Sequence, residues 1–144
     1  MTATIIYKSW TNAHGSDSKQ YQHCVMYARH KNITVKDVFE ITEQNREALL
    51  RKIAYEMSDP NSEPHVLIVY TSCDIEIPGE TSLFLPLIRM GKLEVHEVWA
   101  WRYFNQDSSS MDLWAAFTCA KCKFCHAVQK RHFNFKTAAK PRRK

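Results

Sequence analysis

The residue types with the most evident chemistry lie near the carboxyl end, where three cysteines recur at every third position. Thiolate and imidazole groups are the ligands that zinc prefers, and cysteines separated by two residues are common in such sites. A zinc site here would draw its ligands from Cys119, Cys122, Cys125, His126 and His132. The segment has no glycine or proline to turn the chain between ligands. We therefore favour cysteines that pack along a helix, with no cofactor, and keep zinc as the alternative.

Basic residues dominate the same part of the chain. The segment from Cys119 to Lys144 holds nine of the 20 Lys and Arg residues and no acid, and the other eleven are outnumbered by 15 acids. A basic arm on a mildly acidic body is typical of proteins that bind a polyanion, although such an arm can also be a solvated tail. Because the arm has few bulky apolar groups, we expect nucleic acid, DNA rather than RNA, and no membrane. The predicted phosphate contacts are Lys121, Lys123, Lys130, Arg131, Lys136, Lys140, Arg142, Arg143 and Lys144.

Aromatic residues form a third concentration of functional side chains. They are Trp99, Trp101, Tyr103, Phe104 and Trp114. Beside a basic arm, such rings could stack on unpaired bases. Packing in a core or an interface is the commoner role of such rings, and we favour it for Trp99 and Trp101.

The elements that must position these groups follow from the apolar pattern. Runs rich in β-branched residues predict strands over 4–9, 33–41, 65–71 and 93–101. Helical spacing predicts helices over about 18–32, 43–57 and 80–90, and a long last helix that ends near residue 135. The order β-α-β-α-β-α-β-α implies right-handed crossovers and a three-layer α/β fold with a mostly parallel, four-stranded sheet. We expect a body over 1–105, a long carboxyl-terminal helix over 106–135 and a basic tail over 136–144.

Length and composition limit the class of protein. A chain of 144 residues is long enough for one domain with its own core. No stretch approaches the roughly 20 apolar residues needed to span a bilayer, and the first residues do not resemble a signal peptide. Five cysteines are an odd number and a poor disulfide framework. We therefore expect a reducing, cytoplasmic location.

The carboxyl ends of the predicted strands carry the remaining polar groups, and such ends are where parallel sheets place their sites. On these residues the chain resembles the catalytic domain of serine recombinases of the resolvase and invertase type. The family's first strand ends Tyr-x-Arg-x-Ser-Thr, where this chain has Tyr7-Lys-Ser-Trp-Thr-Asn12. The family's Gln-x-x-x-Leu-x-x-Tyr-Ala helix corresponds to residues 20–28, with Cys24 in place of the Leu. The resemblance continues through Glu40, Arg46 and Asp74 and covers nearly the whole chain.

The resemblance implies a site where a serine hydroxyl attacks a DNA phosphodiester, and this chain departs from that site. Thr11 occupies the nucleophile position, Ser9 the preceding Arg position, and Ile75 and Pro78 two further Arg positions. Guanidinium groups must stabilise the charge of the transition state, and each lost donor costs about two orders of magnitude in rate. We therefore interpret the family positions as vestiges of a catalytic site. They are Ser9, Thr11, Glu40, Arg46 and Asp74.

Three hypotheses follow for function. The first is a non-catalytic, resolvase-like protein that binds nucleic acid through its basic carboxyl end, paired as a homodimer through the last helix, as the resemblance implies. The second is a protein-interaction module, for example of a mobile element, that inhibits or redirects a cellular enzyme. The third is a residual strand-transfer enzyme or phosphodiesterase that uses Thr11 or Ser9.

Overall fold

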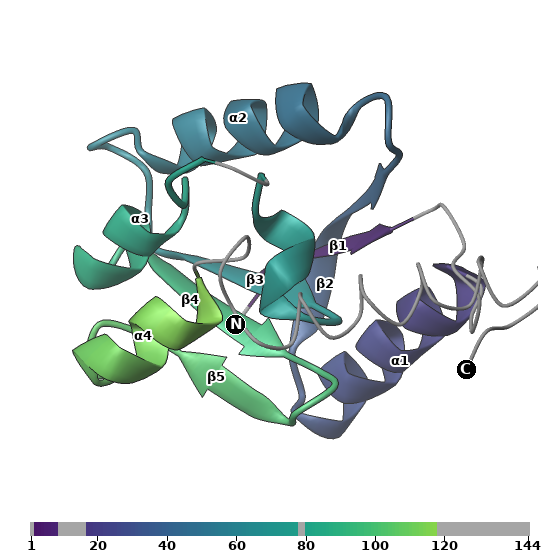
Figure 1. The fold of residues 1–144 in the computed structure, drawn as a ribbon. Coiled ribbons are helices and arrows are strands. Elements are labelled where there is room, and N and C mark those ends of the chain that lie inside the picture. The colour runs from purple at the N-terminus through teal and green to yellow at the C-terminus, as the bar shows by residue number, and fades with distance from the viewer. Residues whose placement is uncertain (1, 9–16, 78–79, 118–144) are drawn as a thin grey trace, which may run out of the picture.

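A computed structural model of the chain describes residues 2–8, 17–77 and 80–117 (Figure 1). Strands and helices alternate along most of this part, as the sequence predicts. The strands are β1 (Thr2–Lys8), β2 (Thr34–Ile41), β3 (His65–Val69), β4 (Leu93–Glu97) and β5 (Arg102–Phe104). The helices are α1 (Asp17–His30), α2 (Arg46–Met57), α3 (Leu85–Arg89) and α4 (Ser110–Ala116), with a 3-10 turn, η1 (Ser72–Ile75), after β3.

One sheet of five strands organises the fold, in the order β2-β1-β3-β4-β5. The pairs β1–β2, β1–β3 and β3–β4 are parallel, whereas β4–β5 is antiparallel. The mostly parallel sheet agrees with the prediction, but the predicted count of four strands is wrong. The predicted strand over 93–101 divides because Val98 and Trp99 donate hydrogen bonds to the carbonyls of Val69 and Tyr70, and Trp101 has a left-handed φ of 51°. The chain therefore turns back and adds β5.

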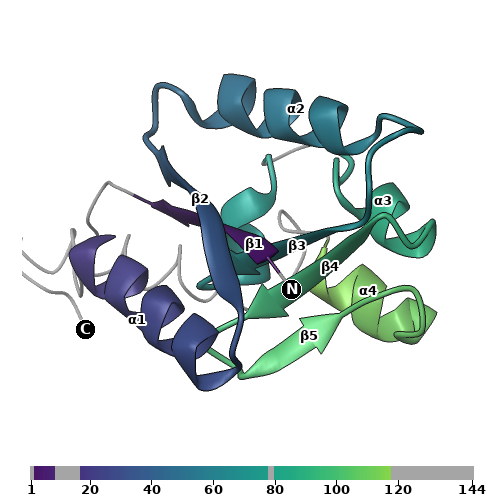
Figure 2. The same cartoon turned by 180° about the vertical axis from the view of Figure 1, so that it is seen from behind.

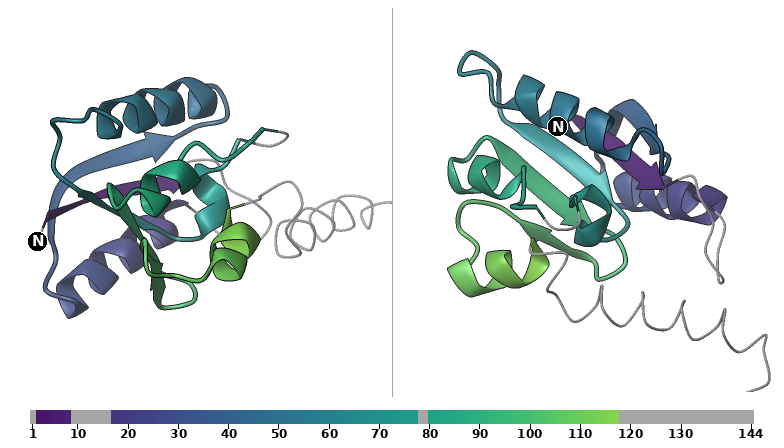
Figure 3. Two further views of the ribbon diagram at one scale, coloured as in Figure 1. Left: turned by 90° about the vertical axis from the view of Figure 1, so that its left-hand side faces the viewer. Right: turned by 45° about the horizontal axis from the view of Figure 1, so that its top comes forward.

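Helices cover both faces of the sheet and make three layers (Figures 1 and 3). On one face α2, α3 and α4 bury a core that includes Leu50, Ile88 and Leu113 against alternate residues of the strands. On the other face α1 packs on the sheet, through Cys24, Tyr27 and Ala28. Since both faces are covered over β1 and β3, the continuous apolar run of β3 has the burial expected of a central parallel strand.

Two helix ends are set by residues with left-handed backbone. Asn32 (φ 58°) follows α1, at the place where the sequence predicts that the helix ends. Gly91 (φ 76°) follows α3, and a Cβ atom there would lie 2.4 Å from the Gln106 side-chain oxygen. The backbone conformation therefore favours glycine at position 91, whereas the Gln106 side chain is flexible and could move away from a Cβ atom.

Two predicted helices are shorter than expected. The helix predicted over 80–90 begins only at Leu85, because the Ser82 hydroxyl accepts the backbone N–H groups of Phe84 and Leu85 and thereby holds the preceding turn. The last helix begins at Ser110, where Ser109 caps it by accepting the N–H of Asp112 at 3.1 Å, and ends at Ala116. The predicted continuous helix over 106–135 is therefore not observed at its beginning, and the rest of it lies outside the described residues.

No helix of the described part is long and apolar enough to cross a membrane.

Candidate functional site

The strand order locates the crevice where a sheet of this kind binds ligands. In the sheet, β1 has β2 as its neighbour on one side and β3 on the other. Connections on the two sides of such a point diverge, and the carboxyl ends of the two strands border an opening. β1 ends at Lys8, and β3 leads into η1 with Asp74. The family resemblance and the topology thus indicate the same edge of the sheet.

Lys8 and Asp74 bind each other across this point. The Lys8 ammonium lies 3.3 Å from Asp74 Oδ1, and only 3% of the Asp74 side chain is exposed. The other carboxylate oxygen accepts the backbone N–H of Thr71 at 3.2 Å. The backbone N–H of Lys8 donates to the Gln20 side chain at 3.2 Å, which joins β1 to α1. The cation that could replace a missing guanidinium is therefore already paired with an acid of the same crevice.

Arg46 is also occupied by groups of the protein. It is the first residue of α2, and its Nη2 donates to the carbonyl oxygens of Cys73 at 3.1 Å and Glu76 at 2.5 Å. These bonds attach the start of α2 to η1. Glu40, by contrast, is exposed near the end of β2. Of the predicted family positions that the structure describes, Arg46 and Asp74 thus meet at one turn.

A buried acid that sequence analysis did not select completes this edge. Glu97, at the end of β4, is 2% exposed and accepts the backbone N–H of Ser72 at 2.7 Å. Its other oxygen pairs with Arg102 Nε at 2.7 Å. The Ser72 hydroxyl donates to the carbonyl of Ala116 at 2.8 Å, so α4 ends at the same edge. A lone Glu after an apolar strand, five residues before an Arg, is the sequence signal that could have identified it.

The cysteine of α1 is a packing residue. Cys24 is fully buried, and burial, followed by the negative charge of Asp74, raises the pKa of its thiol to about 12. A thiol with such a pKa is protonated at neutral pH and does not act as a nucleophile. Cys24 therefore fills the place of the apolar Leu in the family pattern.

Several predicted site residues lie outside the described part of the chain. Among them are Ser9 and Thr11, the cysteine and histidine cluster over 119–132, and every predicted phosphate contact. Within residues 2–8, 17–77 and 80–117, no group of three or more His, Cys, Asp and Glu side chains could hold a metal ion. The zinc site, the nucleic-acid contacts and the homodimer stay predictions.

Of the two roles predicted for Trp99 and Trp101, core or interface, the structure excludes the core. Trp99 and Trp101 are 51% and 54% exposed, so neither belongs to the core. The antiparallel return of the chain into β5 places both in the connection, where Trp101 contacts Tyr27 and His30 of α1 with part of its ring. Trp114 is also exposed, whereas Phe104 is buried against Phe117 with ring centroids 5.4 Å apart.

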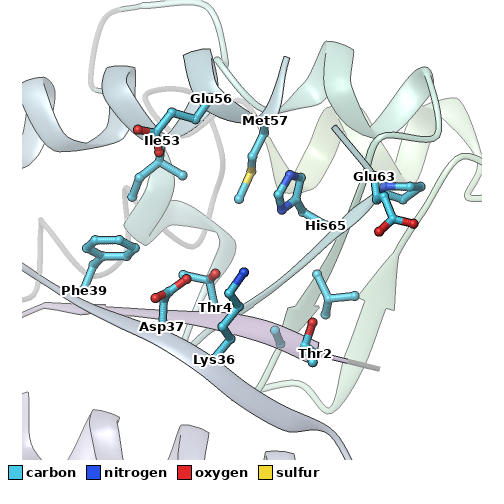
Figure 4. A pocket seen from close by; sticks show the side chains of 13 residues that line it. Thr2, Thr4, Lys36, Asp37, Phe39, Ile53, Glu56, Met57, Glu63 and His65 are labelled. Atoms are coloured by element: carbon cyan, nitrogen blue, oxygen red, sulfur yellow. The ribbon is translucent and has the colours of Figure 1, made fainter. Parts of the chain in front are cut away.

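A pocket of about 350 Å³ lies at the opposite, amino-terminal end of the strands, under α2 (Figure 4). Its lining mixes cations, acids and apolar groups, among them Lys36, Asp37, Met57 and His65. Burial, followed by the charges of Lys92 and Lys36, lowers the pKa of His65. The resemblance places no functional residue in this pocket, and its lining has no single charge that would select one class of ligand.

Comparison with known proteins agrees with the fold. No family model and no curated protein sequence matches the chain. Among solved structures, the N-terminal catalytic domain of TP901-1 integrase is similar, with a TM-score of 0.54 and 12% identity over 94% of this chain and 99% of that chain. The chain has the fold of that catalytic domain. The likeness supports the α/β architecture that the resemblance to serine recombinases implies.

Proposed function

We propose that this chain is a nucleic-acid-binding protein on a resolvase-like body, and that the body does not cleave phosphodiesters. The proposal rests on one observation above all. At the edge where β1 and β3 end, the Lys8 ammonium is held by Asp74, and the Arg46 guanidinium is held by two backbone carbonyls.

Because of these contacts, the positive charges of Lys8 and Arg46 are poorly placed to stabilise the negative charge of a transition state. Catalysis of phosphoryl transfer needs donors aimed at the developing negative charge, and such donors act only if they are not already bound elsewhere. To bind a phosphate here, Lys8 would have to leave a carboxylate that is buried and has few other partners. Breaking a buried ion pair in this way costs several kcal/mol, which a weak substrate complex does not offset. The sequence adds Ile75 and Pro78, which have no donor groups, at two family Arg positions.

The binding half of the proposal rests on charge. Nine basic residues and no acid lie in the last 26 positions, whereas the rest of the chain is acidic. Each phosphate that a Lys or Arg neutralises releases counterions, so affinity supplied by such a segment falls steeply with salt. A protein-interaction module would not show this salt dependence with DNA.

A salt titration of DNA binding tests this half. We expect the slope of log K against log salt to decrease in size by about 3 when Lys140, Arg142 and Arg143 are all changed to Gln, since each lost phosphate contact contributes about 0.9. The matched control removes the same charge from exposed positions of the body, through Lys19→Gln, Lys52→Gln and Arg89→Gln. Equal slopes for the two triple variants would contradict binding through the tail.

A trapping experiment tests the other half. We expect no covalent adduct between the full chain and a DNA substrate with a suicide nick, under conditions that trap phosphoserine or phosphothreonine linkages. An adduct that disappears in Thr11→Ala or in Ser9→Ala would establish the residual enzyme in place of the proposed inactive body.

A further inference from the structure

Exposed aromatic residues gather in the hairpin formed by β4 and β5, and one of them, Trp101, contacts the end of α1. We name Trp99, Trp101 and Tyr103, together with His30 and Lys31, the aromatic surface. Trp99, Trp101 and Tyr103 are 51%, 54% and 57% exposed. Figures 1 and 2 show the carboxyl end of α1 beside the start of β5. The aromatic surface therefore combines residues from two segments that are far apart in the sequence.

Contacts within the surface hold two of the rings in place. Trp101 meets Tyr27 edge-on at 5.0 Å between ring centroids and His30 at 5.1 Å. Tyr103 stacks on His96 at 5.5 Å with 24° between the ring planes. His96 is itself fixed, because Nδ1 shares a 2.6 Å hydrogen bond with the Tyr27 hydroxyl and Nε2 one with Glu94. Rings held in this way lose little freedom when a ligand stacks on them.

The backbone of Trp101 is strained. Its φ of 51° is left-handed, a conformation that glycine or asparagine adopts more easily than a bulky aromatic residue. The strain brings the indole over α1, yet more than half of the residue remains in water. Strained residues of this kind cluster at functional sites, where the strain serves ligand binding.

Charge at the surface favours an anionic ligand. The Lys31 ammonium lies 5.5 Å from the centroid of the Trp101 ring. Arg29, an exposed residue in the last turn of α1, is a second cation at this end of the helix. The nearby acids are satisfied within the protein, Glu94 by His96 and Glu97 by Arg102. Exposed rings between cations are the combination that proteins use for unpaired bases on a phosphate backbone.

We infer that the aromatic surface stacks on the bases of single-stranded nucleic acid. The inference rests on the proposed function and extends it, because it assigns the recognition of unpaired bases to the body and leaves phosphate contacts to the basic tail. A duplex keeps its bases stacked on each other, so it cannot offer them to Trp99 and Tyr103.

Binding of fluorescently labelled 12-nucleotide strands to the full chain tests the inference. We expect Trp99→Ala and Tyr103→Ala each to weaken binding of oligothymidylate about 5- to 100-fold, the effect of losing one stacked base. Tyr103→Phe keeps the ring and should retain the affinity. Tyr55→Ala is the matched control, since Tyr55 is 80% exposed on α2, on the other side of the sheet. Binding of an abasic strand of the same length should be equal in all four variants.

Other outcomes separate the inference from the proposed function. If duplex DNA binds with a steep salt dependence and the ring variants bind oligothymidylate like the parent chain, the inference is wrong and the proposed function stands. If no nucleic acid binds, both fail. If the ring variants keep oligothymidylate affinity but lose a protein partner that the parent chain captures, the surface is a protein-docking site and the inference is wrong. Circular dichroism and thermal unfolding establish that each variant is folded.

Discussion

The carboxyl edge of the sheet and the aromatic surface differ in where their functional groups point. At the edge, Lys8, Arg46 and Asp74 have the residue types of a catalytic site, yet each is bound by another group of the protein. At the aromatic surface, by contrast, more than half of Trp99 and of Tyr103 is exposed. The comparison teaches that residue types typical of a catalytic site can be bound within the fold, while exposed rings and cations gather on another part of the molecule.

The largest effect is expected from removal of Asp74, the buried acid at the carboxyl edge of the sheet. We expect Asp74→Ala to lower the free energy of unfolding by about 3 kcal/mol, because it leaves Lys8 without its buried partner and the Thr71 N–H without an acceptor. Urea denaturation measures the loss. Asp37→Ala, at an exposed acid of β2, should change stability little and serves as the control. An equal, small effect of both would mean that Asp74 is free for another role.

A second variant tests the guanidinium that the family pattern retains. We expect Arg46→Ala to lower the free energy of unfolding by about 2 kcal/mol, since the carbonyls of Cys73 and Glu76 lose a charged donor. DNA affinity of the folded variant should equal that of the parent chain. Arg89→Ala removes an exposed arginine of α3 and should leave stability within about 0.5 kcal/mol. A variant that is fully stable but has lost DNA affinity would assign Arg46 to the ligand.

The amino-terminal pocket offers a third, smaller effect that sharpens the contrast between the two ends of the sheet. The pKa of His65 is lowered in the folded chain, so protonation favours the unfolded state. The stability from the neutral imidazole is complete above the unfolded pKa of about 6.5 and is lost as the pH falls through the lower folded pKa. We expect His65→Gln to reduce the decline in the free energy of unfolding between pH 7 and 5. Denaturation curves measure this decline when the value at each pH is compared with the value of the same variant at pH 8. An unchanged decline would contradict the role of His65.

The smallest expected change concerns the stability of the aromatic surface itself. Trp99→Ala and Tyr103→Ala remove largely exposed rings and should each leave the free energy of unfolding within about 0.5 kcal/mol. Trp101→Ala should cost more, because the indole packs against Tyr27 and His30. Thermal unfolding of the three variants provides the test. Losses above about 2 kcal/mol for Trp99→Ala or Tyr103→Ala would mark them as structural residues and remove the contrast with the edge.

Sequence analysis predicted the repeating elements well where periodicity was strong. The helix ending at Asn32, the helix ending at Met57 and the buried strand beginning at His65 all agree with the structure. It failed after residue 93, because alternation of apolar and polar residues continues through a chain reversal. Nothing in the pattern Trp-Ala-Trp over 99–101 distinguishes a strand from a tight turn, and the left-handed backbone of Trp101 is unusual for its residue type.

The sequence predicted which residues lie at the candidate site, but not which of them bind each other. The sequence places Lys8, Arg46 and Asp74 at element ends, and parallel strands bring these ends to one edge. Which of these residues bind each other depends on where η1 lies and on where α2 begins. Neither of these features produces a periodic pattern in the sequence. Glu97 was missed for the same reason, since its partners Ser72 and Arg102 come from two different elements.

The hydrogen bond from the Ser72 hydroxyl to the Ala116 carbonyl fixes the end of α4 on the body. It anchors the carboxyl end of the last described helix to the edge where β1 and β3 end, only a few residues before the most cationic stretch of the sequence. If that stretch binds a polyanion, as we propose, the bound strand would be tethered near this edge. Such tethering would raise the local concentration of the strand around the body to about the millimolar range for a short linker, so that weak contacts made by the body would become effective.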